Sequence, residues 1–132
     1  MRKARFDWLL ALLLAYGAAS LFHHVHNAKF LDQYPNMPAW LSPAGVYAAW
    51  LGVTLVGVAG YLMFRHGFRI AGLLVIAAYG VLGFDGLAHY GLAPASAHSF
   101  MMNLTIWLEV ATAALLLVAV GNLLVRRARS LS

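Results

Sequence analysis

Four stretches of about twenty or more mostly apolar residues fill most of this 132-residue chain. A helix rises 1.5 Å per residue, so about 20 apolar residues are enough to cross the hydrocarbon core of a bilayer. The stretches are residues 6–25, 44–64, 68–90 and 96–125. They predict an all-α polytopic membrane protein, with four transmembrane helices in an antiparallel up-down bundle. The bundle forms a single domain over residues 1–132, with one longer outer loop at residues 26–43.

The composition supports this class and excludes several others. Hydrophobic residues make up 63% of the chain and charged residues only 10%, whereas soluble domains carry about 25% charged residues. Nucleic-acid-binding modules and disordered tails are therefore excluded. The chain contains no cysteine, which also excludes thiolate metal sites and disulfide scaffolds.

The basic residues predict the orientation. Lys and Arg stay on the cytoplasmic side during membrane insertion. Eight of the nine flank the predicted spans on one side: Arg2, Lys3, Arg5, Arg65, Arg69, Arg126, Arg127 and Arg129. Only Lys29 falls on the other side. We therefore expect cytoplasmic N- and C-termini in a membrane that is most simply a bacterial inner membrane.

Local signals place the helix ends. Ser42 followed by Pro43 is typical of an N-cap and first-turn proline, and Pro94 with Ser96 predicts the same at the fourth helix. Gly67 lies in the short turn between the second and third spans. The first span also resembles a cleavable signal peptide, because small residues at 17–20 follow a basic start. A stripe of polar residues through Ser20 and His24 continues past the expected cleavage point. This continuity favours a first span that stays part of the protein.

Five of the six histidines are predicted to gather at the outer membrane boundary. His66 falls in the opposite turn, as a solvated loop residue. The other five, with Asp85, form the predicted set of metal ligands: Asp85, His89 and His98 first, followed by His24, and then His23 and His26. Asp85 and His89 are four residues apart and are expected to share one helix face.

Imidazoles from three segments with one carboxylate suit a transition metal, either copper or zinc. Histidines also tolerate membrane interfaces well, because the ring has an apolar body and a polar tip. Each of the five alone is therefore compatible with a purely interfacial or hydrogen-bonded role. The shared depth of all five favours a metal site.

Two local similarities point to the same chemistry. The spacing Asp85-x3-His89-x8-His98 is similar to a copper-binding Asp-x3-His…His pattern in a membrane subunit of the particulate methane monooxygenases. Ser20-x3-His24 with Asp85 resembles elements of the ceramidase and adiponectin-receptor zinc hydrolases. Each similarity covers a few residues; the first implies copper and the second implies zinc-dependent hydrolysis.

Glu109, like Asp85, is an acid within a predicted span. It lies eleven residues after His98, on the same helix face and about 16 Å deeper. An intramembrane carboxylate without a Lys or Arg at its depth is costly and favours a functional role. Glu109 and Ser20 are therefore the candidate catalytic residues, although the sequence leaves open whether the protein is an enzyme.

Two other functions are compatible with the pattern. Two of His24, His89 and His98 would be the axial ligands of a haem in an electron-transfer subunit. Alternatively, the protein is a non-catalytic subunit or ion-coupled binding protein of a membrane complex, or a homodimer. Its expected partners are the lipid bilayer and other membrane proteins. The glycines of the second and third spans are expected to allow close helix packing.

Overall fold

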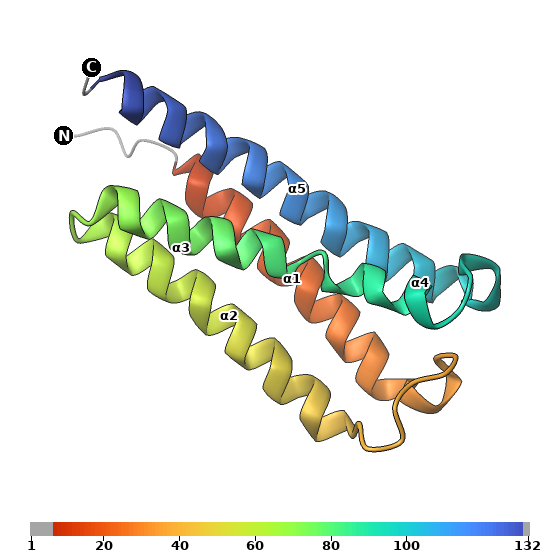
Figure 1. Cartoon of the computed structure of the whole chain (residues 1–132). Coiled ribbons are helices and arrows are strands. Elements are labelled where there is room, and N and C mark those ends of the chain that lie inside the picture. The colour runs from red at the N-terminus through yellow and green to blue at the C-terminus, as the bar shows by residue number, and fades with distance from the viewer. Residues whose placement is uncertain (1–6, 131–132) are drawn as a thin grey trace.

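The computed structural model describes residues 7–130, in which every regular element is helical (Figure 1). Within these residues four long helices are joined by loops and turns, some of which contain short segments of 3-10 helix. In chain order the elements are α1 (Trp8–Lys29), η1 (Leu31–Gln33), α2 (Pro43–Arg65), α3 (Arg69–Leu82), η2 (Asp85–Ala88), α4 (His89–Leu92), η3 (Ala95–Ala97) and α5 (Phe100–Arg129).

Four helical segments are long and apolar enough to cross a membrane, as predicted. They are Trp8–Lys29, Pro43–Arg65, the composite segment Arg69–Leu92 and Phe100–Arg129. Arg2, Lys3 and Arg5, on which part of the predicted orientation depends, lie outside the described residues. The first span extends four residues beyond its predicted end, so that His26 and Asn27 belong to α1.

The observed helix starts match the sequence signals at α2 but not at α5. Ser42 caps α2, with its hydroxyl accepting from the Gly45 amide at 3.1 Å, and Pro43 is the first helical residue. The prediction of an N-cap at Ser96 is wrong, because Pro94 is followed by a 3-10 turn. Ser99 caps α5 instead, accepting from the Met102 amide at 3.2 Å.

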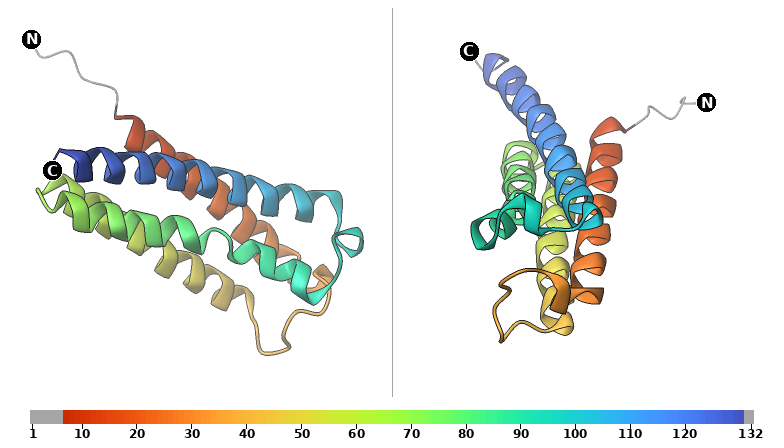
Figure 2. Two further views of the ribbon diagram at one scale, coloured as in Figure 1. Left: turned by 45° about the horizontal axis from the view of Figure 1, so that its top comes forward. Right: turned by 90° about the vertical axis from the view of Figure 1, so that its right-hand side faces the viewer.

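The two ends of the bundle differ in chemistry. At one end, which we call the basic end, lie the start of α1, the α2–α3 turn and the end of α5 (Figure 2). There the Asp7 carboxylate accepts from the Tyr61 hydroxyl at 2.7 Å and from the Arg65 guanidinium at 3.3 Å. Gly67 adopts φ +98° in the tight turn, and His66 is exposed, as expected. At the other end, the loop end, lie residues 30–42 and 93–99.

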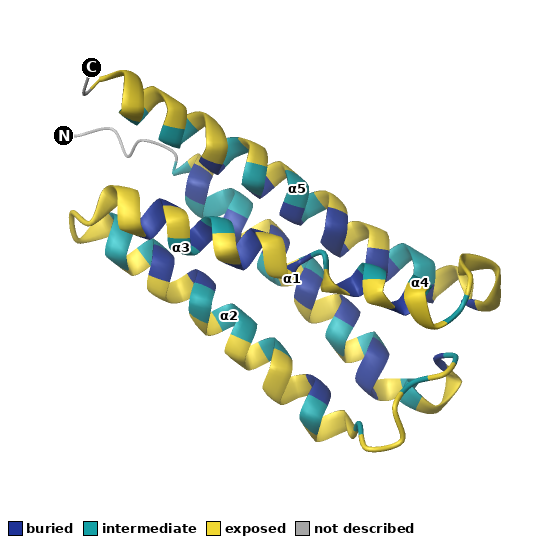
Figure 3. Cartoon of the chain, in the orientation of Figure 1, coloured by how far each residue is buried: buried dark blue, intermediate teal, exposed yellow. Residues whose placement is uncertain are grey.

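The buried face of α1 changes character along its length. Its core positions follow the alternating spacing of four and three that packs one helix against another: Leu9, Leu13, Tyr16, Ser20, His23 and Asn27. Towards the basic end this stripe joins an apolar core with residues of α3 and α5, among them Ile76 and Leu116. Towards the loop end the same stripe is polar. Figure 3 shows that α2 contributes little to the buried interior.

Glycines bring α2 and α3 into close contact near the basic end. A Cβ on Gly72 would lie 2.5 Å from the Phe64 amide nitrogen and 2.8 Å from the Gly60 carbonyl oxygen, both backbone atoms. Packing through small residues was predicted for several glycines and is confirmed at Gly57 and Gly60. Gly52 is different, since a Cβ there would have no atom within 4 Å.

The third span is broken, which the sequence analysis did not predict. The α-helix ends at Leu82, and after Gly83 and Phe84 the chain continues as the 3-10 turn η2 before α4. A Cβ on Gly83 would lie 2.6 Å from the Ala113 Cβ and 2.7 Å from the Tyr16 ring. The expected α-helical face shared by Asp85 and His89 is therefore wrong, because the intervening residues are 3-10.

Candidate functional site

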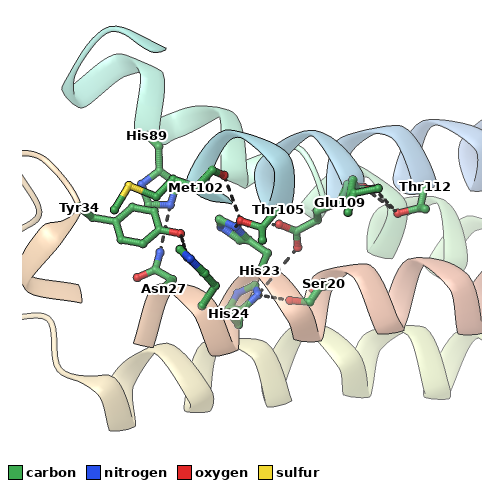
Figure 4. Close-up of polar contacts among 12 residues, drawn as sticks. Ser20, His23, His24, Asn27, Tyr34, His89, Met102, Thr105, Glu109 and Thr112 are labelled. Carbon is green, nitrogen blue, oxygen red and sulfur yellow. Dashed lines mark hydrogen bonds and ion pairs between the residues drawn. The ribbon is translucent and has the colours of Figure 1, made fainter. Parts of the chain in front are cut away.

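A cluster of polar side chains fills the interior of the bundle towards the loop end (Figure 4). It draws on α1, the loop after it, the broken third span and α5. Its buried members are Ser20, His23, Asn27, Tyr34, His89, Thr105 and Glu109, with His24 partly buried at its edge. We refer to these eight residues as the polar cluster.

His23 lies at the centre of the polar cluster and is 3% exposed. Its Nδ1 lies 3.2 Å from the Thr105 hydroxyl oxygen. That hydroxyl donates its own hydrogen to the Met102 carbonyl at 3.0 Å, so it accepts the hydrogen of His23 Nδ1. The other ring nitrogen, Nε2, therefore carries a lone pair.

The lone pair of His23 faces Glu109. His23 Nε2 lies 3.8 Å from Glu109 Oε2, and His24 Nδ1 lies 3.9 Å from Oε1 of the same carboxyl. The Oε2 atom is buried without a hydrogen-bond partner among residues 7–130. A Cβ on Gly86 would lie 3.3 Å from Oε2 and 3.9 Å from His23 Nε2. The missing side chain of Gly86 thus keeps space free beside both atoms.

His24 is held by the backbone. Its Nδ1 donates to the Ser20 carbonyl at 2.9 Å, one turn earlier in α1. A carbonyl only accepts, so the second nitrogen of His24 also carries a lone pair.

His89 and Tyr34 close the cluster towards the loop end. The Asn27 amide donates to His89 Nε2 at 3.1 Å, and the Tyr34 ring packs on the His89 ring with centroids 4.9 Å apart. The Tyr34 hydroxyl lies 2.9 Å from His26 Nδ1. Burial raises the pKa of Tyr34 to about 12, so the phenol stays neutral at physiological pH.

The predicted ligands separate into two groups. The structure brings His23, His24 and His89 together; the ring centroids of His23 lie 5.6 Å from those of His24 and 5.4 Å from those of His89. His98 is also buried and has a ring contact with His89, with centroids 6.1 Å apart, while its Nδ1 donates to the Pro94 carbonyl at 3.0 Å. His26 is bonded to Tyr34.

The two predicted acids are placed differently from expectation. Asp85 is exposed at the edge of a cavity, whereas Glu109 is buried beside His23 and His24. Glu109 was expected about 16 Å deeper than His98 and apart from the other histidines. Helix lengths account for the difference, because His23 is six residues from the end of α1, about 9 Å along the axis. The signal for this pairing was the polar continuation of the α1 core stripe.

The residues missed by the sequence analysis are mainly partners of the histidines. Thr105, Asn27 and Tyr34 were not among the predicted site residues, and each contacts a histidine of the cluster. Ser20, a candidate catalytic residue, is 1% exposed. Its backbone carbonyl orients His24, and its side chain interacts with the carboxyl of Glu109, the other candidate.

Within residues 7–130, no three His, Asp or Glu side chains are placed so that they could hold one metal ion. The polar cluster nevertheless contains buried atoms without hydrogen-bond partners in this part of the chain, including Asn27 Oδ1, His89 Nδ1 and Glu109 Oε2. An unpaired buried polar group costs about 1–3 kcal/mol. Three such atoms in one place indicate room for a bound group.

A cavity of about 510 Å³ adjoins the polar cluster. One wall is polar, and the other consists of apolar side chains from α2, the preceding loop and the broken third span. The polar wall comprises His23, His24, Asn27, Asp85, His89 and Glu109. A cavity of this size lies within the range of small-molecule sites.

Comparison of the chain with protein-family models, curated proteins and solved structures returned no match.

Proposed function

We propose that the chain is an integral membrane protein that binds a zinc or copper ion between His23 and Glu109, with His24 as the third ligand. The observation that carries this proposal is the pair of atoms His23 Nε2 and Glu109 Oε2. They lie 3.8 Å apart, the nitrogen carries a lone pair, and the oxygen has no hydrogen-bond partner in the described chain.

The environment of His23 is the one that a metal ligand needs. Ligating histidines donate their other ring N–H to a protein acceptor, which fixes the tautomer and the ring orientation. Thr105 is that acceptor for His23. Zinc lies about 2.0–2.2 Å from nitrogen and oxygen ligands, so two donors on one ion are separated by at most about 4 Å.

The third ligand requires a side-chain rotation. His24 Nδ1 is 3.9 Å from Glu109 Oε1 but donates to Ser20. To become the third ligand, His24 would have to release the Ser20 carbonyl and reorient its side chain. Imidazole and carboxylate donors suit both zinc and copper.

The same proposal includes an orientation. Arg65, Arg69, Arg126, Arg127 and Arg129 lie at the basic end, opposite the polar cluster, and basic residues favour the cytoplasmic side. We therefore place the polar cluster in the outer half of an antiparallel bundle, with both termini in the cytoplasm. Cysteine accessibility labelling from either side of the membrane, at Ser130 and at Asn36, tests this part.

Metal binding is tested by titrating Zn²⁺ or Cu²⁺ into chelator-treated full-length protein in nanodiscs, with calorimetry and elemental analysis. We expect one ion per chain. Glu109→Gln preserves the shape of the side chain and is expected to weaken binding at least about tenfold, since one charged ligand is lost. His26→Ala is the matched control on the same helix and should bind as the wild type does.

A wild-type protein that binds neither ion would refute the proposal. Equal losses in Glu109→Gln and His26→Ala would refute the ligand assignment. Thr105→Val leaves the proposed ligands in place and removes the acceptor for His23, together with the hydroxyl's bond to the Met102 carbonyl. Loss of such a supporting hydrogen bond typically weakens metal affinity about 10–100-fold. A Soret band in the purified protein would instead support the haem alternative. A metal-free preparation with a stoichiometric membrane partner would support a non-catalytic subunit.

A further inference from the structure

We infer that the cavity beside the polar cluster takes an uncharged, hydroxyl-bearing amphiphile from the lipid phase. Its head group would lie against Asn27, His89 and Glu109, and its hydrocarbon chain along α2. This inference concerns a second kind of ligand and rests on the cavity, so it holds with or without a bound metal ion.

The division of the cavity into two walls carries the argument. The lining contributed by α2 is apolar and consists of Val46, Ala49 and Val53, whereas the polar side chains come from α1, the broken third span and α5. A water-filled cavity in a membrane helix bundle has no need of one continuous apolar wall. A molecule with a polar head and a hydrocarbon chain satisfies both walls at once.

The free atoms of the polar wall specify the head group. As placed, Asn27 Oδ1 accepts a hydrogen, and His89 Nδ1 carries one, because His89 Nε2 accepts from Asn27. Both atoms lack partners among the described residues, and both side chains are more than nine-tenths buried. A hydroxyl donates and accepts, so it can bond to both atoms.

The acids of the cavity lining disfavour an anionic head group. The cavity lining contains two acids, Asp85 and Glu109, and no Lys or Arg. A carboxylate or phosphate head would be brought beside like charge with no cation to pair with it, which is strongly unfavourable in a site of low polarity. An uncharged head avoids this repulsion.

The cavity is reached from the side of the bundle. Val81, Leu82 and Leu92 line it and are 60%, 41% and 40% exposed, and Ala49 on the facing wall is also exposed. In a span of this length these exposed apolar side chains face lipid. α2 and the broken third span diverge towards the loop end (Figure 1), and both carry exposed apolar residues of the cavity lining, so an amphiphile enters laterally.

Photolabelling of the full chain in nanodiscs, in the presence of chelator, tests this inference without any contribution from metal. The probe is a long-chain alcohol with a diazirine in its hydrocarbon chain, and the matched probe is the fatty acid of the same length. We expect the alcohol to label the first half of α2 and the segment η2–α4 about tenfold more than the acid, because the acid brings an unpaired charge. Excess unlabelled alcohol should compete.

Ala49→Trp, which fills the cavity, should abolish this labelling. Ala48→Trp is the matched control, since its side chain is exposed and does not line the cavity. Equal labelling by both probes, labelling without competition, or labelling spread over lipid-facing positions such as Leu115 and Val118 would each overturn the inference. The competition measurement uses only the wild-type chain, so it decides the question even if a variant misfolds. A protein that binds metal but not the alcohol would leave the proposed function intact.

Discussion

The close approach of α2 and α3 at Gly72 gives a prediction whose magnitude follows from the structure. In Gly72→Ala the new Cβ would lie 2.5 Å from the Phe64 amide nitrogen and 2.8 Å from both the Phe64 Cα and the Gly60 carbonyl oxygen. Favourable contact between such atoms begins at about 3.5 Å. All three neighbours are backbone atoms, which cannot rotate away, so the helices must separate by roughly 1 Å.

Overpacking of this kind costs about 1–3 kcal/mol, and rigid backbone neighbours place Gly72 at the upper end. Replacing a helical glycine by alanine regains about 0.5–1 kcal/mol. We therefore expect Gly72→Ala to lower the free energy of unfolding by about 2 kcal/mol. Gly52→Ala is the matched control on α2, where a Cβ meets nothing within 4 Å. It should be neutral or slightly stabilising.

Unfolding of the purified protein by increasing SDS in mixed micelles, followed by circular dichroism, measures both variants. If Gly72→Ala proved as stable as the wild type, the packing argument would be wrong. If Gly52→Ala were destabilised equally, the loss would reflect glycine replacement in general.

Two further predictions concern pH. Hydrogen bonds from the Leu10 amide and the Tyr61 hydroxyl, with the Arg65 charge, hold the pKa of Asp7 below its usual range. The ionised carboxylate therefore stabilises the folded protein above the ordinary carboxyl pKa, and this contribution is lost as pH falls through the lowered pKa of the folded state. Asp7→Asn should therefore flatten the decline of melting temperature in acid, and an unchanged decline would contradict this assignment. Burial raises the pKa of Tyr34 to about 12. The neutral phenol therefore contributes its full stabilisation of the folded protein below the ordinary pKa of about 10, and this contribution is lost as pH rises through the pKa of the folded state. Between these two pH values the melting temperature of Tyr34→Phe should fall less steeply than that of the wild type. Parallel melting-temperature profiles would refute the role of Tyr34.

The helices were predictable because their signals are local. Span length and hydropathy gave four membrane-crossing segments, and Ser42 and Pro43 gave the start of α2. The break after Leu82 was not predictable in this way. Glycine in a membrane helix usually serves packing, and nothing in the local pattern distinguishes Gly83, where the α-helix stops, from Gly80, where it continues.

Which residues form the site could not be predicted from the periodicity of the sequence. Spacing within one helix fixes which residues share a face, but not which face of a neighbouring helix they meet. In lipid, the hydrophobic pattern is also weak, since exposed and buried positions are both apolar. His23 was therefore ranked below His89 and His98, although it alone contacts both Thr105 and Glu109.

The energetics of the α1 stripe explain why the polar cluster points to a bound group and not to packing. The positions occupied by Leu9, Leu13 and Tyr16 near the basic end show that this stripe can be filled by apolar or aromatic side chains in the same register. At the loop end the same register holds His23 and Asn27, and atoms of Asn27, His89 and Glu109 are left without partners in the described chain. Partly satisfied polar groups are worse for stability than an apolar core of the same shape. A bundle stabilised only by packing would be more stable with the leucine stripe continued, and this cost is the physical ground for proposing a ligand that completes the hydrogen bonds or coordination of the polar residues.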